Sequence, residues 1–126
     1  MTDEMAALAA LAREDLETAR RNLTAGAFRH AVSRAYYGAF HAASAALIGE
    51  GYRPRSHSGV QKAFSNAFVR TGPLEREAGR VYSRLMQLRH DADYDVGRSI
   101  SEGAAAAAVR DASALVADLL AQIEAT

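Results

Sequence analysis

The side chains best suited to chemistry gather in residues 89–95, which hold an arginine, a histidine, three aspartates and a tyrosine. Such a set could act on a phosphodiester bond. Arg89 would stabilise charge on the phosphate, while His90 or Tyr94 would position a ribose 2′-hydroxyl or exchange protons with it. We therefore take Arg89, His90, Asp93 and Tyr94 as candidate catalytic residues. The alternative is a polar helix terminus, in which an arginine pairs with an aspartate and the tyrosine packs on a neighbour.

Helix geometry limits which of these side chains can meet. On a continuous helix, His90 and Tyr94 are neighbours four residues apart, and so are Arg89 and Asp93. Arg89 and Tyr94 are five residues apart, which places them about 140° apart around the axis at 3.6 residues per turn. We expect those two to converge only if the helix end unwinds or a second subunit supplies one of them.

Three arginines recur at intervals of four residues in the segment before this stretch, at Arg76, Arg80 and Arg84. On a helix they would form a basic ridge leading toward Arg89, which could contact phosphates. The alternative is a solvated face whose arginines pair with nearby carboxylates. Arg80 and Arg84 are candidate binding residues, as is Tyr37 on an earlier helix.

Other chemistries find little support in the sequence. His30 and His41 lie eleven residues apart, or about 16 Å along a helix, so they cannot ligate one ion. The chain has no cysteine, which excludes disulfides, cysteine-bound zinc and a thiolate nucleophile. No serine lies in a nucleophile-elbow context, and no glycine-rich loop of phosphate-binding type is present. We therefore expect neither a metal ion nor a cofactor.

The elements that must position these residues are helices, because apolar residues recur with a 3.6-residue period and nowhere alternate as in a strand. Ser56 and Ser101 are suitable N-caps, and Pro73 suits a first helical turn. We predict an all-α protein, an up-and-down bundle of four main helices plus one short helix, forming a single domain over residues 1–126. The predicted helices are 3–24, 28–48, 58–70, one from Pro73 to between 93 and 97, and one from about 101 to 123.

The composition limits the partners and the cellular location that we expect. The formal net charge is zero, so any nucleic-acid contact must come from a local basic patch. Alanine supplies 29 residues, which favours closely packed helices and a core that a partner subunit could complete. No apolar run is long enough to span a membrane, and the start is acidic where a signal peptide is basic. We expect a cytoplasmic protein with no membrane contact.

Three segments together resemble the HEPN family (higher eukaryotes and prokaryotes nucleotide-binding). Residues 31–43 read AVSRAYYGAFHAA, which is similar to the second-helix signature of small prokaryotic members. Residues 56–60, SHSGV, resemble the family's next helix start, and residues 84–94, RLMQLRHDADY, resemble its L-R-x-x-A-D-Y motif. With the alanine-rich final helix, the resemblance covers nearly the whole chain in the family's order.

The resemblance implies a helical bundle that often forms a homodimer and is often paired with a minimal nucleotidyltransferase. Many members are toxins that act as metal-independent endoribonucleases through an R-x4–6-H motif, with two copies facing each other across the dimer cleft. Here Arg89 matches the motif's arginine, but Tyr94 stands where the x4 spacing places the histidine. Arg84 and His90 also satisfy an x5 spacing, but earlier in the helix than the motif's usual place.

Two main functional hypotheses follow. The first is a toxin-like endoribonuclease of a toxin–antitoxin or nucleotidyltransferase-paired system, using Arg89 and Tyr94. The second is a non-catalytic dimeric subunit that binds a nucleotide or a nucleotidyltransferase partner. A plain structural bundle, in which the polar motif only caps a helix, is the third possibility.

Overall fold

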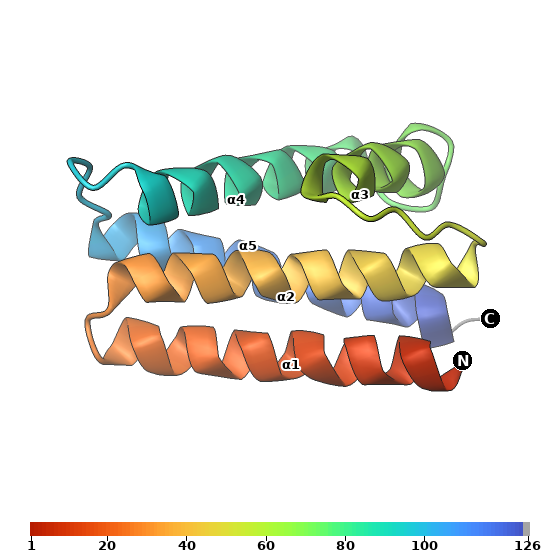
Figure 1. The fold of residues 1–126 in the computed structure, drawn as a ribbon, viewed down its shortest axis with the longest axis horizontal. Helices are drawn as coiled ribbons and strands as arrows, with labels where there is room; N and C mark the ends of the chain where they lie inside the picture. Colours follow the sequence, from red (N-terminus) through yellow and green to blue (C-terminus); the bar gives the residue numbers. More distant parts are fainter. Residues whose placement is uncertain (125–126) are drawn as a thin grey trace.

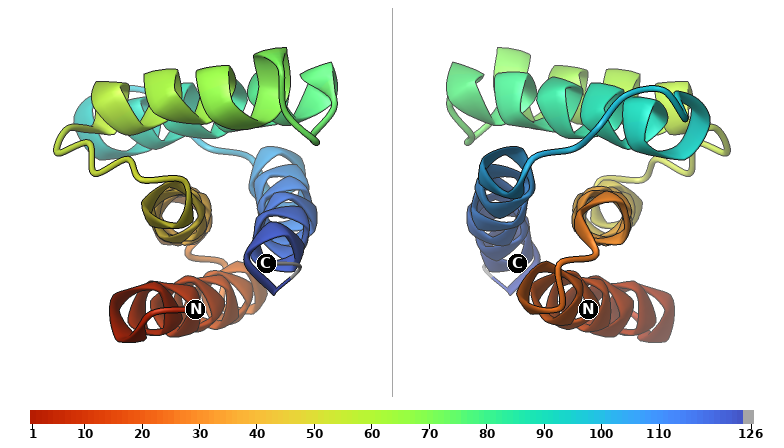
Figure 2. Two further views of the ribbon diagram at one scale, coloured as in Figure 1. Left: turned by 90° about the vertical axis from the view of Figure 1, so that its right-hand side faces the viewer. Right: turned by 90° about the vertical axis from the view of Figure 1, so that its left-hand side faces the viewer.

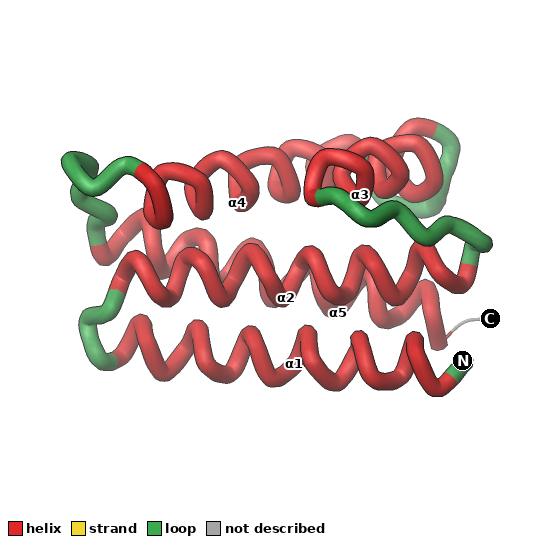
Figure 3. The backbone as a smooth tube through the Cα atoms, in the orientation of Figure 1, coloured by secondary structure: helices red, strands yellow, loops and turns green. Residues whose placement is uncertain are grey.

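Five α-helices and one π-helical segment make up the regular structure of residues 1–124, the part of the chain that the computed structural model describes (Figure 1). Over that range no strand is present, and Figure 3 shows only helices and connecting loops. The predicted all-α bundle of four long helices and one short helix is confirmed. The elements are α1 (Asp3–Thr24), α2 (Phe28–Gly49), α3 (His57–Phe64), the π-helical segment Ser65–Arg70, α4 (Arg76–Tyr94) and α5 (Glu102–Glu124).

The two ends of the bundle carry different parts of the chain. The α4–α5 connection and the turn between α1 and α2 lie at one end, and both termini lie near the other (Figure 1). Helix α2 runs through the middle of the fold and contacts α1, α4 and α5. Seen end-on in Figure 2, α3 and α4 form a layer that crosses above α2 and α5. None of the described helices is both long and apolar enough to cross a membrane.

Small residues on α2 let the other helices approach closely. Seven alanines of this helix are buried, at positions 31, 35, 39, 42, 43, 45 and 46. At Gly38, an added Cβ would lie 3.1 Å from Cδ2 of Leu16 on α1. The absence of a side chain at Gly38 thus leaves room for Leu16, and α1 packs closely on α2.

Local capping signals set several helix ends as predicted. Ser56 accepts a hydrogen bond from the Gly59 backbone N–H at 2.9 Å, so α3 begins at His57. Ser101 accepts one from the Ala104 N–H at 3.0 Å, and α5 begins one residue later. The sequence predicts the short third helix as one element over 58–70, whereas the observed chain continues beyond Phe64 as the π-helical segment.

The prediction that Pro73 lies in the first turn of the fourth helix is wrong, because α4 begins at Arg76. The cause is a tight turn, in which the Leu74 N–H donates to the Phe68 carbonyl at 2.8 Å. At Gly72 an added Cβ would lie 2.3 Å from the Ala67 carbonyl oxygen, so only glycine fits. The backbone therefore remains in this turn through Leu74, and the helix begins only at Arg76.

Candidate functional site

The four candidate catalytic residues occupy the last turns of α4, and the predicted neighbours do meet. Arg89 Nη1 lies 3.6 Å from Asp93 Oδ2, and the rings of His90 and Tyr94 are 5.0 Å apart between centroids. The exposures differ sharply: Arg89 is 8% exposed, whereas Tyr94 is 67% exposed. The cation is therefore buried and the phenol faces solvent.

Arg89 and Tyr94 approach each other within one subunit, which the angle between them did not lead us to expect. The guanidinium carbon of Arg89 lies 6.0 Å from the centre of the Tyr94 ring, and α4 remains helical through Tyr94. The expectation that convergence needs an unwound end or a second subunit is wrong. The long arginine side chain can bridge the angle, so Tyr94 lies beside both Arg89 and His90.

Aromatic rings from α2 form the bed on which Arg89 lies. Its guanidinium carbon is 4.9 Å from the Tyr36 ring centre and 6.0 Å from that of Tyr37. Such contacts attract a cation through the negative face of the ring, and they strengthen when water is excluded. Tyr37, a candidate binding residue, is thus brought to the site.

The buried positive charge of Arg89 has few anionic or hydrogen-bonding partners. Asp93 is the only carboxylate of residues 1–124 within ion-pair distance, and it also accepts a hydrogen bond from the Ser33 hydroxyl. The Nε atom of Arg89 is buried without a hydrogen-bond partner. A buried cation normally has a close carboxylate and a full set of acceptors, so this one is suited to receive an additional anion.

The groups below Arg89 cannot supply that negative charge. Tyr36 Oη lies 2.7 Å from His57 Nδ1, and the Tyr82 hydroxyl is buried beside Tyr36. Burial raises the pKa of both the Tyr36 and Tyr82 phenols. Burial, with Arg89 and His41 nearby, lowers the pKa of His57. All three groups are therefore neutral near pH 7.

Asp15 on α1 carries a buried carboxylate that was not among the residues predicted from the sequence. Its carboxylate lies 2.6 Å from His41 Nδ1 and 3.2 Å from Arg34 Nη1, so it is already shared between two basic side chains. The signal was present in the sequence, because Asp15 stands on the apolar stripe between Ala12 and Ala19. An acid in that position is normally paired when buried.

A polar depression of about 450 Å³ adjoins the arginine site where α1, α2 and α4 meet. Arg34 lies on its wall, with its guanidinium carbon 4.8 Å from the centre of the Tyr37 ring. The depression thus offers a second cation, hydroxyls and an amide beside the aromatic bed of Arg89. Its lining residues are Thr18, Asn22, His30, Ser33, Arg34, Tyr37 and Asp93.

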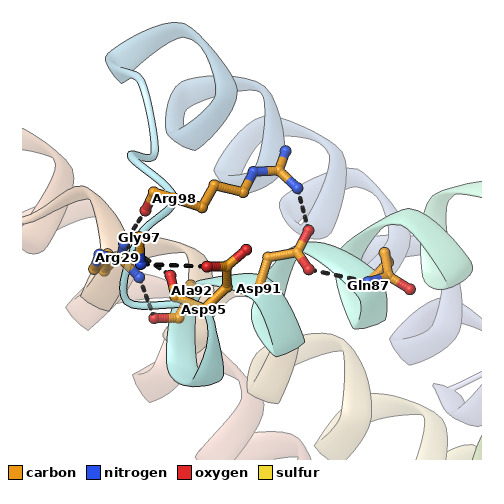
Figure 4. Close-up of polar contacts among 7 residues, drawn as sticks. All are labelled: Arg29, Gln87, Asp91, Ala92, Asp95, Gly97 and Arg98. Carbon is orange, nitrogen blue, oxygen red and sulfur yellow. Dashed lines mark hydrogen bonds and ion pairs between the residues drawn. The ribbon is translucent and has the colours of Figure 1, made fainter.

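The C-terminal end of α4 is fixed by an arginine from the beginning of α2. Arg29 donates to the carbonyls of Ala92, at 2.6 Å, and Asp95, at 3.2 Å, and also to the carbonyl of Arg98 (Figure 4). Arg98 in turn pairs with Asp91 on α4. These contacts satisfy carbonyls that a helix end leaves free, and they hold the segment that carries Tyr94.

Arg80 and Arg84 lie away from this cluster. Both bind Glu77, at 3.0 Å and 2.9 Å, on an exposed face of α4. Hydrogen bonds from Arg84 and Arg80 hold the pKa of the Glu77 carboxyl below its usual value. For these two residues the geometry matches the solvated, carboxylate-paired face that the sequence left as the alternative to a phosphate-contacting ridge.

No group of three or more histidine, aspartate or glutamate side chains in residues 1–124 is arranged to hold a metal ion. The described cluster offers the chemistry of its own side chains. A guanidinium can bind an anion, and an exposed phenol and imidazole in contact can exchange protons.

Comparison with known proteins gives consistent matches. Residues 5–122 match the HEPN domain. "Putative toxin MJ0605" of Methanocaldococcus jannaschii is 37% identical over 102 residues, which are 81% of this chain and 76% of that protein. A "UPF0332 protein" of Thermotoga maritima is 40% identical over 83 residues, 66% of this chain and 63% of that protein. The crystal structure of TT1696 from Thermus thermophilus superposes with a TM-score of 0.82 over 96% of this chain and 99% of that chain, and at 15% identity it supports the fold alone.

Proposed function

The chain belongs to the HEPN domain family, and on that premise we propose that it is a toxin-like HEPN protein that cleaves RNA without a metal ion. A relative named as a toxin matches 81% of the chain, which supports the toxin-like character. The observation that carries the proposal is Arg89, a buried cation with one carboxylate contact at 3.6 Å and an unpartnered Nε. A phosphodiester supplies the anion that this guanidinium lacks.

In the proposed reaction, the ribose 2′-oxygen attacks the adjacent phosphorus and the bond from phosphorus to the 5′-oxygen breaks. The products are a 2′,3′-cyclic phosphate and a free 5′-hydroxyl. Arg89 binds the non-bridging phosphate oxygens and stabilises the charge that develops on them. The phosphate replaces the Asp93 carboxylate, which is the more exposed partner of the pair.

The protons are accounted for by the two exposed side chains. His90 accepts the 2′-hydroxyl proton and Tyr94 donates one to the leaving 5′-oxygen. The rings are 5.0 Å apart, so a proton can return from His90 to Tyr94, directly or through a water molecule, and close the cycle. Tyr94 thereby serves as an acid, a role that a phenol fills more readily than that of a base at neutral pH.

The test is cleavage of total RNA by the purified protein in EDTA, comparing the wild type with Arg89→Lys and Tyr94→Phe. We expect both variants to cut at least about a hundredfold more slowly, with a cyclic phosphate at the wild-type product end. Tyr94 is exposed, so Tyr94→Phe removes the hydroxyl while leaving the fold intact. Equal cleavage by the wild type and both variants would exclude the proposal.

We further propose that two copies associate through the end of the bundle that carries Tyr94. Val96, which is 91% exposed, is a large apolar side chain two residues beyond Tyr94, and a second copy would cover it. Light scattering of the wild type and Val96→Asp checks this. We expect a dimer that Val96→Asp weakens, and a wild-type monomer would contradict it.

A non-catalytic subunit is the second candidate, and two observations favour it. Arg89 is 8% exposed and the motif position five residues later holds Tyr94 in place of histidine. Such a site would bind a nucleotide or hold a minimal nucleotidyltransferase without cutting RNA. Co-expression with the product of a neighbouring gene tests this. A stable complex without RNA cleavage would favour the subunit role.

A further inference from the structure

A groove of about 660 Å³ runs between the start of α4 and the second half of α5, far from Arg89. From Glu77 to Arg89 the helix rises by about 18 Å at 1.5 Å per residue, so the two places are separate. One part of the lining is apolar and comes from both helices and the turn before α4. These residues are Pro73, Leu74, Ala78, Val81, Ala114, Leu115 and Ala121.

The remaining lining is acidic. Four carboxylates border the groove, at positions 75, 77, 111 and 118, and Gln122 completes the polar part of the described lining. Glu77 is paired with Arg80 and Arg84, and Asp111 with Arg110. Within residues 1–124, Glu75 and Asp118 form no ion pair, and no basic side chain lines the groove. The groove thus has an apolar floor with an excess of negative charge.

The shape indicates an elongated occupant. The α5 lining recurs every three or four residues from Asp111 to Gln122, which spans about 16 Å, or three helical turns. The spacing is the period of α5 itself, and the length of the lining leaves room for a partner helix of about three turns. Glu75 and Asp118, with no basic side chain among the lining residues, disfavour a phosphate-bearing ligand, so nucleic acids and nucleotides do not suit this place.

We propose that this α4–α5 groove binds an amphipathic helical segment of a protein partner, with apolar residues on one face and lysines or arginines flanking them. The apolar face covers Leu74, Val81 and Ala114. The flanking cations approach Glu75 and Asp118. The groove therefore gives this chain a protein-docking surface that does not involve the RNA site.

The probe is a synthetic three-turn peptide with leucines on one face and lysines and arginines beside them, labelled for fluorescence anisotropy. Its controls are a scrambled peptide of the same composition and a version in which glutamates replace the basic residues. We expect saturable binding of the basic amphipathic peptide alone, weakening as salt is added.

The decisive variants are Ala114→Arg and Ala117→Arg, two exposed positions on the same helix of which only Ala114 lines the groove. We expect Ala114→Arg to weaken peptide binding about tenfold or more, and Ala117→Arg to leave it unchanged. If Ala114→Arg fails to fold, the double variant Glu75→Lys with Asp118→Lys should lose binding in the same way.

Three results would overturn the proposal. One is the absence of saturable binding, or equal binding of the scrambled peptide. Another is an equal loss of binding in Ala114→Arg and Ala117→Arg. The third is a homodimer that Ala114→Arg dissociates and Ala117→Arg does not, because a second copy would then occupy the groove.

Discussion

The Asp15 carboxylate on α1 lies 2.6 Å from His41 Nδ1 on α2 and thereby joins two neighbouring helices by a hydrogen bond at a buried position. Arg34 reaches the other carboxylate oxygen at 3.2 Å from nearer the start of α2. One buried carboxylate therefore contacts two side chains of the central helix and links α1 to α2.

Removing this acid should be costly. We expect Asp15→Asn to lower the free energy of unfolding by about 3 kcal/mol, because it leaves Arg34 and His41 without their anion. Urea unfolding followed by circular dichroism measures the change. The neighbouring exposed Glu14→Gln is the matched control, and we expect it to have little effect. Equal midpoints for the two variants would show that the buried contact contributes nothing to stability.

Replacing Asp93 tests whether Arg89 lacks an anion. Asp93→Asn removes its only carboxylate partner among the described residues, and we expect a loss of about 1 kcal/mol because Asp93 is partly exposed. Added phosphate should then raise the melting temperature of Asp93→Asn more than that of the wild type, because the carboxylate no longer competes. Thermal melts with and without phosphate give both values.

Asp91→Asn is the control for that experiment, since Asp91 lies two residues earlier and binds Arg98 and Gln87 instead of Arg89. We expect it to leave the phosphate effect unchanged. If phosphate stabilises the wild type and Asp93→Asn equally, Arg89 is not an anion-binding group.

His57 should make the fold sensitive to mild acid. Burial lowers the pKa of its imidazole in the folded state below the ordinary value of 6.5, so the unfolded chain binds more protons as the pH falls through that range. The contribution to stability is therefore complete above about pH 6.5 and decreases below it. Melting temperatures of the wild type and His57→Gln between about pH 7.5 and 5.5 should show a smaller decrease for the variant. Parallel curves would contradict this assignment.

Arg29 should control the order of the segment that carries Tyr94. Arg29→Lys keeps the charge but cannot reach three carbonyls with one planar group, so we expect a loss of about 1–3 kcal/mol. Backbone hydrogen exchange in residues 95–100 should also become faster. The exposed Arg55→Lys provides the comparison. Unchanged exchange in that segment would show that other contacts hold the loop.

Elements of this fold can be predicted from sequence where the interaction that sets them is local. Ser56 and Ser101 were recognised as caps because a cap and the amide it binds lie three residues apart. The start of α4 was misplaced because Leu74 hydrogen-bonds to Phe68, six residues back, in a turn that no nearby motif announces. The hydrogen bond between Leu74 and Phe68 thus outweighs the local preference of Pro73 for a first helical turn.

The site shows the same limit. The stretch around Arg89 was found by residue type, but its burial comes from Tyr36 and Tyr37 on another helix. The lack of negative charge beside Arg89 also depends on another helix, because His57 of α3 lies near Arg89 as a neutral group. Periodicity could identify which residues lie on one helix, but it could not show which face of α2 would receive the guanidinium.

The alanines of α2 also determine which mutations the protein can tolerate. In an interior filled by large side chains, truncation leaves cavities and is the main hazard. Here seven buried alanines and Gly38 have little volume to lose, so enlargement is the hazard, because the neighbouring helices are closely packed and an added Cβ at Gly38 would already lie 3.1 Å from Leu16. The volume of the side chain at each of these positions therefore has an upper limit. Exchanges among glycine, alanine and serine are the main substitutions that the helix can accept.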